Sequence, residues 1–454
     1  MNEKVTFGSK IGLIAATVGS AVGLGNVWRF PAETQSNGGA AFLLVYVICV
    51  FLLGIPVMLG EFALGRGGKS SAIGVYQRLT PGKPWWVAGA ISTLASYLIL
   101  CFYMVVAGWT LEYLIQSVTG NLYNINPVAE GGMNNAFATR MADYIVSPWK
   151  PLLFTLGVIL INLFILLRGV KKGIEKMSNI MMPLLFVLLL IFVGVSLSLD
   201  KAAEGLKFFL SPDFSKITPG VIINALGQAF FSLSLGMGIL VTYASYYPKD
   251  TRLGKTAITV SLLDLLVAFM MGLIIFPAVT TFGLTGENLE GATLVFVTLP
   301  EIFMHMPCPQ LWSTLFFLLL LVAAVSSTLS IAEVTVMTCQ EHFRVSRVKA
   351  CCIVLLPLIL FSSVCSLSQG VLSDYTIFGM NIFTFLDTVT TNVMLPLGSI
   401  LMCIYVGWIL KPSFLQGEIT NNGTLKSRLL PVIAFIIRWI APVLITIIMI
   451  SQFL

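Results

Sequence analysis

Six charged side chains lie inside long apolar stretches of this 454-residue sequence, where water would not solvate them. They are Arg29, Glu61, Asp264, Glu333, Asp387 and Arg438. A charge in hydrocarbon costs about 2.5–3.5 kcal/mol or more, so such residues usually bind a ligand or pair with one another. Carboxylate, amide and hydroxyl oxygens suit a hard cation such as sodium. Asp264 therefore suggests a cation site or a structural ion pair, whereas a lone serine equally suits a bond to its own helix.

Glycine interrupts two of the apolar stretches. One contains GSAVGLGN over 19–26, and the other contains SLSLGMG over 232–238. Glycine lowers helix propensity and tolerates backbone conformations that a helix forbids. An unwound helix offers carbonyl oxygens to a cation and N–H groups to a carboxylate. The two breaks predict a site for both ends of a zwitterion with sodium between them, although glycine also allows close helix packing in membranes.

The elements that carry these residues are long apolar segments. The chain is 57% hydrophobic and 10% charged, a composition that does not give a water-soluble surface. About 20 apolar residues cross a bilayer as a helix, whose backbone polar groups are satisfied within the segment. The sequence predicts eleven spans, at 11–36, 40–64, 87–118, 151–168, 177–199, 220–246, 256–283, 312–340, 349–368, 381–410 and 430–453.

Basic residues indicate the orientation of the spans. If the N-terminus is cytoplasmic, most of the 26 Lys and Arg residues fall in segments on the inside. This bias predicts a multi-pass protein of the plasma (bacterial inner) membrane with its N-terminus in the cytoplasm and its C-terminus outside. The same distribution argues against nucleic acid as a partner, in spite of a net charge of +6.

The two interrupted stretches each open a set of five spans. Because five spans end on the opposite side of the membrane, two such sets have opposite orientations. The sequence predicts one domain over 1–454, with inverted repeats at about 11–199 and 220–410 and an extra helix at 430–453. Broken helices that meet near the membrane midplane are typical of such repeats.

Six motifs are spread along the chain: GSAVGLGNVWRFP (19–31), NGGAAF (37–42), GIPVMLGEFALGR (54–66), GQAFFSLSLGMG (227–238), TYASY (242–246) and AVSSTLSIAE (324–333). Together they resemble the neurotransmitter:sodium symporter family, and eleven spans are similar to its bacterial members that take hydrophobic amino acids. The resemblance implies an all-α polytopic membrane protein with the five-plus-five inverted-repeat, leucine-transporter-like fold. It also implies sodium-coupled symport by alternating access.

The resemblance further implies one substrate site and two sodium sites. The substrate would contact Ala21, Leu24, Gly25, Ile99, Tyr103, Phe231, Ser232, Ser234, Met237, Ser327 and Ile331. The first sodium would be bound by Ala21, Asn26, Ser232 and Asp264, and the second by Gly19, Val22, Ala323, Ser326 and Ser327. Arg29 and Asp387 would form an outer gate, with Tyr103 and Phe231 as a lid. The inner gate would use Lys4, Phe7, Tyr246 and Glu341.

Three positions depart from the family pattern. Gly23 replaces the aspartate of monoamine carriers, so the substrate should bring its own carboxylate. Asp264 and Ala268 replace the asparagine and serine of chloride-dependent members. A fixed carboxylate would offset the charge of two sodium ions, which predicts chloride independence. Lys4 replaces the usual arginine of the inner gate and is a less rigid partner.

These features predict uptake of a zwitterionic amino acid. Met237 would give the pocket an adaptable wall, which favours a large hydrophobic or aromatic side chain, with a leucine-sized pocket as the alternative. A receptor-like homologue that binds ligand without coupled transport, or a channel, is the competing class. The sequence has no Ser/His/Asp grouping or metal cluster that favours an enzyme. Expected partners are the amino acid and membrane lipid, without an obligate protein partner.

Overall fold

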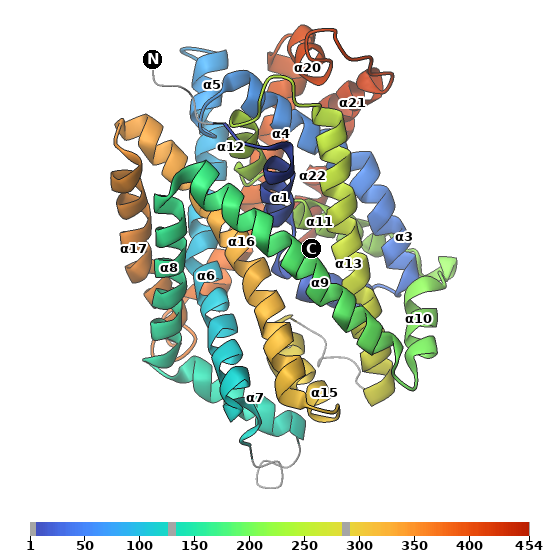
Figure 1. Cartoon of the computed structure of the whole chain (residues 1–454). Helices are drawn as coiled ribbons and strands as arrows, with labels where there is room; N and C mark the ends of the chain where they lie inside the picture. The colour runs from blue at the N-terminus through green and yellow to red at the C-terminus, as the bar shows by residue number, and fades with distance from the viewer. Residues whose placement is uncertain (1–5, 126–132, 284–290, 454) are drawn as a thin grey trace.

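The computed structural model of the protein describes residues 6–125, 133–283 and 291–453. Figure 1 shows a bundle of long helices that run roughly parallel or antiparallel to one another. One end of the bundle holds the N-terminus, α5 and α20, and is called the α5 end below. The other holds α7, α10 and α15, and is called the α7 end. Lys4 lies outside the described residues.

The elements follow in chain order, with η for short 3₁₀- or π-helical segments. They are α1 (Lys10–Ala21), η1 (Gly25–Arg29), α2 (Phe30–Ser36), α3 (Ala40–Cys49), η2 (Val50–Gly54), α4 (Ile55–Gly68), α5 (Gly74–Leu79), α6 (Trp86–Thr119), η3 (Asn121–Tyr123), α7 (Met133–Val146), α8 (Lys150–Leu167), η4 (Val170–Glu175), α9 (Lys176–Leu197), α10 (Ala202–Leu210), η5 (Phe214–Lys216), α11 (Pro219–Ser232), α12 (Ile239–Ser245), α13 (Leu253–Phe282), α14 (Gly291–Thr293), η7 (Leu294–Thr298), α15 (Leu299–Met304), α16 (Pro309–Phe343), α17 (Arg347–Leu367), β1 (Thr376–Ile377), β2 (Met380–Asn381), α18 (Ile382–Val389), η8 (Thr390–Met394), α19 (Leu395–Ile404), η9 (Tyr405–Ile409), α20 (Pro412–Ile419), α21 (Leu430–Phe435), η10 (Ile436–Ile440) and α22 (Ala441–Ser451).

Most of the predicted spans coincide with continuous helices. In the described part of the chain, nine helices are long and apolar enough to cross a membrane, and the pair Lys10–Ala21 and Gly25–Ser36 is a tenth candidate with a 53° bend. The predicted sixth span is divided into α11 and α12 by the segment 233–238. The total of eleven depends on counting these two helices as one span, and stays a prediction.

Local backbone chemistry explains both breaks. After α1, Val22 adopts an extended conformation (φ −73°, ψ 109°), which ends the helix before η1 resumes it. After α11, Ser234, Gly236 and Gly238 all have positive φ, at 53°, 79° and 73°. Glycine adopts such angles without steric cost, whereas a run of them cannot continue a right-handed helix. The glycine pattern in the sequence therefore marks both breaks correctly.

The broken helices lie in the interior of the bundle. α1 packs against α9, α13 and α16, and α12 packs against α4 and α16. α16 also packs against α6, and Figure 1 shows both helices running along the bundle. A two-stranded hairpin of β1 and β2, with Thr376 opposite Asn381, leads into α18 and was not predicted from the sequence.

Candidate functional site

A buried cluster joins the first broken span to α13. The Nδ2 atom of Asn26 donates to Asp264 Oδ1 at 2.9 Å and to Ser232 Oγ at 3.2 Å. Ser232 Oγ donates to Asp264 Oδ2 at 2.7 Å. All three residues are fully buried. Three of the four residues predicted for the first sodium thus share one network, and Ala21 lies beside it on the wall of the cavity described below.

Among the described residues, the carboxylate of Asp264 accepts hydrogen bonds from neutral donors only. The third donor is the hydroxyl of Tyr46, at 3.4 Å from Oδ2. None of the ion pairs among the described residues involves Asp264. Its alternative role as part of a structural ion pair is therefore not found, and an ionised carboxylate here would suit a bound cation. Tyr46 was not predicted, because it comes from α3, outside the glycine-broken motifs.

The residues predicted for the second sodium also lie together. Ser327 Oγ donates to the carbonyl oxygen of Val22 at 3.3 Å, and Ser326 Oγ donates to that of Ala323 at 2.9 Å. A Cβ atom built on Gly19 would lie 3.3 Å from Ser326 Cβ. The end of α1 and the middle of α16 thus bring carbonyl and hydroxyl oxygens close together, and oxygen ligands of this kind are those that a hard cation prefers.

A cavity of about 750 Å³ lies next to the breaks and extends to residues of the α7 end. All eleven predicted substrate residues line it. The backbone N–H of Leu24, freed by the break, donates to the hydroxyl of Tyr103 at 3.2 Å. Ser234 Oγ donates to the carbonyl oxygen of Ser20 at 2.8 Å and so joins the two breaks. Free N–H groups beside a phenol hydroxyl form a suitable site for a carboxylate.

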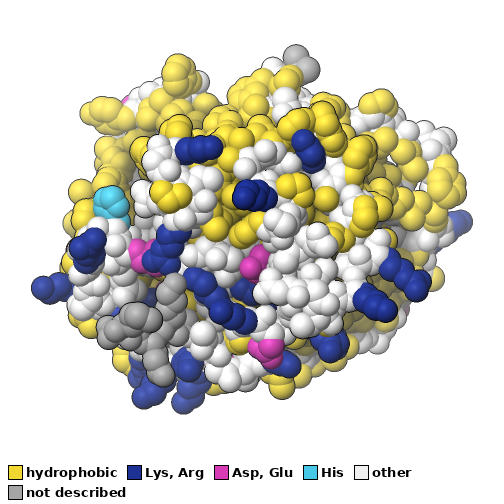
Figure 2. Space-filling view, turned by 90° about the horizontal axis from the view of Figure 1, so that it is seen from above, with side chains coloured by type: hydrophobic (Ala, Val, Ile, Leu, Met, Phe, Trp, Pro, Cys, Tyr) yellow, Lys and Arg dark blue, Asp and Glu magenta, His cyan; other side chains and the backbone are white. Residues whose placement is uncertain are grey.

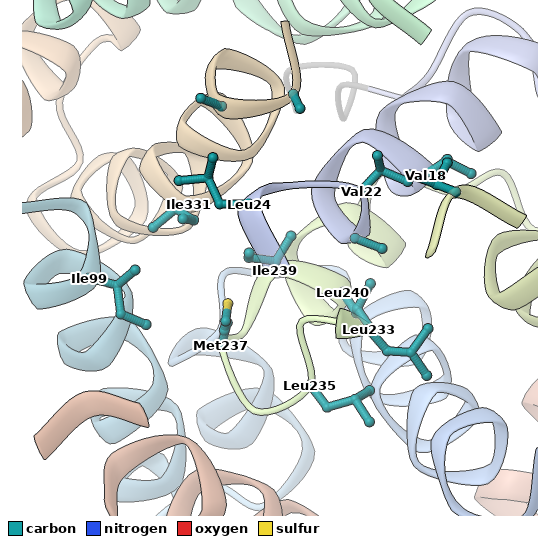
Figure 3. Packing of buried hydrophobic residues seen from close by; sticks show 14 of the residues in the cluster. Val18, Val22, Leu24, Ile99, Leu233, Leu235, Met237, Ile239, Leu240 and Ile331 are labelled. Atoms are coloured by element: carbon teal, nitrogen blue, oxygen red, sulfur yellow. The ribbon is translucent and has the colours of Figure 1, made fainter. Parts of the chain in front are cut away.

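Apolar side chains form another part of the cavity wall. Figure 3 shows Ile99, Met237, Ile331 and Leu24 around the turn of the second break. They come from α6, the 233–238 segment, α16 and the first break. Phe231 adds an aromatic ring to the same wall. The polar groups of the breaks and this apolar surface together fit an amphipathic small molecule.

Close packing requires glycine at two positions of the first break. A Cβ atom on Gly23 would lie 2.6 Å from Ser327 Oγ and 3.0 Å from the Tyr103 hydroxyl. A Cβ atom on Gly25 would lie 2.8 Å from the ring of Phe231. Larger side chains at these positions would have to displace groups that line the cavity, so the glycines preserve its shape.

The predicted outer gate is not closed. Arg29 and Asp387 both line the cavity but form no ion pair with each other. Instead, Arg29 Nε lies 3.7 Å from Glu33 Oε1, and its guanidinium carbon lies 4.6 Å from the ring centroid of Phe231. Thr391 Oγ1 donates to Asp387 Oδ1 at 3.2 Å. Glu33 was missed as a partner of Arg29, although its i,i+4 spacing was a visible signal.

Buried contacts join the helices at the α5 end, with partners that differ from those predicted for the inner gate. The hydroxyl of Tyr246 donates to Glu333 Oε1 at 2.7 Å, and Arg347 holds both oxygens of Glu333 at 2.7 and 2.6 Å. Glu341 does not join this group. It accepts from the backbone N–H of Ser71 at 2.8 Å and from the Ser70 hydroxyl. The sequence showed Glu333 as a buried charge but did not show its partner.

Two further contacts hold the α5 end. The backbone N–H of Phe7 donates to the carbonyl oxygen of Tyr246 at 3.2 Å, and its ring packs against Tyr243 and Tyr246. Arg66, on α4, contacts Glu418 of α20 at 2.6 Å and the carbonyl oxygen of Thr251 at 2.6 Å. The cavity is therefore separated from the α5 end by contacts between different helices.

Glu61, which does not line the cavity, contacts the second break. Its Oε1 atom accepts the backbone N–H of Gly236 at 2.7 Å. Glu61 is fully buried on α4. This contact satisfies a backbone group that the unwound segment leaves without a helical partner, so the intramembrane charge at Glu61 has a structural role.

Comparison with known proteins identifies the family. The family model for the sodium:neurotransmitter symporter family matches residues 4–135 and 140–454. The chain belongs to the sodium:neurotransmitter symporter family. Its members are transporters, and the family predicted from the six motifs is confirmed.

Relatives and a solved structure match over nearly the whole chain. An uncharacterized sodium-dependent transporter of Bacillus subtilis (strain 168) is 36% identical over 449 residues, which cover 99% of this chain and 98% of the relative. One from Haemophilus influenzae is 33% identical, with coverage of 99% and 98%. The crystal structure of MhsT in complex with L-phenylalanine is 42% identical, with a TM-score of 0.88 and coverage of 98% and 99%. The leucine-transporter-like fold of this symporter is thus confirmed.

Proposed function

We propose that this symporter couples the inward movement of sodium to the uptake of a zwitterionic amino acid, by alternating access and without chloride. The observation that carries the proposal is the junction of the two broken helices at the cavity. There, the Leu24 N–H and Tyr103 hydroxyl lie near the network of Asn26, Ser232 and Asp264. One bound carboxylate can contact both groups, so sodium and substrate would each strengthen the binding of the other.

Gly23 supports an amino acid over an amine. Its Cβ position is 2.6 Å from Ser327 Oγ and 3.0 Å from the Tyr103 hydroxyl, so a side-chain carboxylate does not fit there without displacing them. The substrate would then supply its own carboxylate. Its amino group would face the carbonyl groups at the ends of α1 and α11, where the helix dipole favours a cation.

Asp264 supports independence of chloride. Its two oxygens accept hydrogen bonds from Asn26, Ser232 and Tyr46, and such donors stabilise an ionised carboxylate. With a zwitterionic substrate, two sodium ions would leave two positive charges in a site of low dielectric. A negative charge on Asp264 would offset one of them, which would remove the need for a bound chloride ion.

The pocket wall favours a large hydrophobic or aromatic side chain. Ile99, Phe231, Met237 and Ile331 line the cavity, and L-phenylalanine is the ligand in the MhsT structure, with which this chain shares 42% of its residues. The flexible thioether of Met237 adapts to rings and to branched chains. Leucine is the smaller alternative within the same class.

Charge distribution supports a cytoplasmic α5 end. Figure 2 looks onto this end and shows Lys and Arg side chains spread over it. Cytoplasmic segments of membrane proteins carry an excess of such residues. In this orientation the N-terminus is inside, the C-terminus is outside after eleven spans, and the cavity opens to the outside of the plasma membrane.

Uptake of radiolabelled amino acids into proteoliposomes tests the proposal. We expect a sodium gradient to drive uptake of phenylalanine, tryptophan, tyrosine or leucine, and to drive it equally when gluconate replaces chloride. Asp264→Asn should lower uptake in gluconate by about 10- to 100-fold, since hydrogen bonds to a charged group contribute about 1.5–3 kcal/mol. The matched control is Ser261→Ala, one turn earlier on α13 and also buried.

The outcomes separate the parts of the proposal. Uptake that requires chloride in the unmodified protein would contradict the role of Asp264 and leave sodium coupling intact. Sodium-dependent binding without uptake or exchange would favour the receptor-like alternative. Equal losses in Asp264→Asn and Ser261→Ala would mean that any change in this part of α13 is harmful.

A further inference from the structure

Arg438 is not among the residues that line the cavity. It lies in η10, in the middle of the last apolar helix, Leu430–Ser451, whose most apolar window is only 28% buried inside the protein. Its neighbours on the outer face are apolar and exposed: Val432, Phe435 and Trp439 have exposed fractions of 53%, 55% and 51%. A charge on such a face is costly in hydrocarbon unless it reaches a polar partner.

Two tryptophans hold the guanidinium group. The Cζ atom of Arg438 lies 4.2 Å from the ring centroid of Trp408 and 5.8 Å from that of Trp439. Trp408 Nε1 donates to the carbonyl oxygen of Arg438 at 3.0 Å. A Cβ atom on Gly407 would lie 2.9 Å from the Arg438 Cα, so glycine permits η9 and η10 to approach closely. The arrangement fixes the position of the cation on the protein surface.

The cation lacks an anionic partner within the described residues. None of the ion pairs found there includes Arg438, and no oxygen there accepts a hydrogen bond from its guanidinium group. From Tyr405 to Ser451, the sequence contains a single acidic residue, Glu418, and Arg66 is its partner. The five N–H donors of Arg438 are therefore available to an external acceptor.

Arg438 lies within the apolar part of the last helix, and its long side chain can extend toward the headgroups on the side where α21 begins. Arg438 is eight residues from the start of α21, or roughly 12 Å along the helix axis. Tryptophan prefers the boundary between hydrocarbon and headgroups, and a long arginine side chain can extend from a span toward it. Lys411 comes just after the end of η9, and Arg428 comes just before the start of α21. Both side chains are exposed. The connection between η9 and α21 thus offers two further exposed basic groups.

We propose that Arg438, held in place by Trp408 and Trp439, binds the phosphate of an anionic phospholipid, with Lys411 and Arg428 adding attraction for its negative headgroup. The planar guanidinium group matches two phosphate oxygens, which makes arginine well suited to this contact. Clusters of basic residues near the membrane surface attract anionic lipids in the same way. A second copy of the chain is a poor occupant, because a symmetric contact would bring like charges together.

Native mass spectrometry of the full chain in detergent with equal amounts of phosphatidylglycerol and phosphatidylethanolamine tests the proposal. The unmodified protein should retain phosphatidylglycerol in preference. Arg438→Gln should weaken that binding by about fivefold or more. The matched control is Arg168→Gln, because Arg168 is also exposed and its Cζ lies 4.1 Å from the ring centroid of Phe164. This control should bind phosphatidylglycerol like the unmodified protein.

Four results would overturn the proposal. The first is that the unmodified protein shows no preference for phosphatidylglycerol, and the second is that both variants lose lipid binding equally. The third is that inorganic phosphate displaces the lipid. The fourth is that the protein forms a dimer that Arg438→Gln abolishes. If Arg438→Gln does not fold, Arg438→Lys replaces it, because lysine keeps the charge without the planar guanidinium group. Arg438→Lys should show an intermediate loss of phosphatidylglycerol binding. Unchanged lipid binding in Arg438→Lys would also count against the proposal. The test has no transport readout, so its failure leaves the proposed function untouched.

Discussion

Among the described residues, the ion pairs at the α5 end connect different helices, whereas the ion pair beside the cavity toward the α7 end stays within one helix. At the α5 end, Glu333 on α16 binds Arg347 at the start of α17, and Arg66 on α4 binds Glu418 on α20. At the α7 end, Arg29 pairs with Glu33, and Asp387 accepts from Thr391. Each of the last two contacts joins residues that are four positions apart, so each stays within its own continuous helix.

This difference explains why the cavity is closed at one end only. A contact within one helix stabilises that helix but does not hold it to another. A buried contact between helices does, because separating the two would leave a charge without its partner. The proposed alternating access would require the reverse arrangement as well, in which Arg29 would meet Asp387 and the bonds of Glu333 would be broken. Three substitutions test this comparison.

Glu333→Gln should have the largest effect, because it leaves the charge of Arg347 without its carboxylate. Loss of one partner of a buried pair costs about 3–5 kcal/mol. We expect the α5 end to open and sodium-driven uptake to fall by at least about tenfold. Cys339 lies on the same helix and is 6% exposed. Its rate of alkylation, measured by peptide mass spectrometry, should rise. An unchanged rate would contradict the role of this pair in closure.

Arg66→Gln should have an intermediate effect. The side chain is 4% exposed and bonds to Glu418 and the carbonyl oxygen of Thr251, so its loss should reduce the free energy of unfolding by about 1–3 kcal/mol. The control is Arg78→Gln, whose side chain is 47% exposed and lies 3.6 Å from Glu341. The pair of Arg78 and Glu341 should contribute about 0–1 kcal/mol to the free energy of unfolding. Thermal unfolding of both variants provides the measurement, and equal shifts would argue against a special role for Arg66.

Glu33→Gln should have the smallest effect, and in the opposite direction. Arg29 and Glu33 have exposed side chains of 28% and 27%, and such a pair contributes about 0.2–1 kcal/mol. Without it, Arg29 is free to pair with Asp387, which favours the closed cavity. We expect about two- to fivefold tighter binding of the amino acid in sodium, measured by scintillation proximity. Glu33→Asp keeps the charge and serves as the control. Weaker binding in Glu33→Gln would mean that Glu33 attracts substrate instead.

Much of the site could be predicted before any coordinates were available. The glycines in the sequence predicted a helix break, and Gly236 and Gly238 adopt positive φ at that break. All eleven predicted substrate residues line one cavity. Tyr46 and the partner of Glu333 could not be found in the same way. Both depend on contacts between helices far apart in the chain, Tyr46 with Asp264 and Arg347 with Glu333.

The sequence by itself determined where the helices run, where two of them break, and which residues come to the breaks. These features follow from local properties, namely apolar length and the conformational freedom of glycine. Only the tertiary structure decided which partner each charge takes. Arg29 has a possible carboxylate partner in Glu33 on its own helix and another in Asp387 far along the chain. The choice between them depends on whether the α7 end is open, which is a property of how whole helices pack.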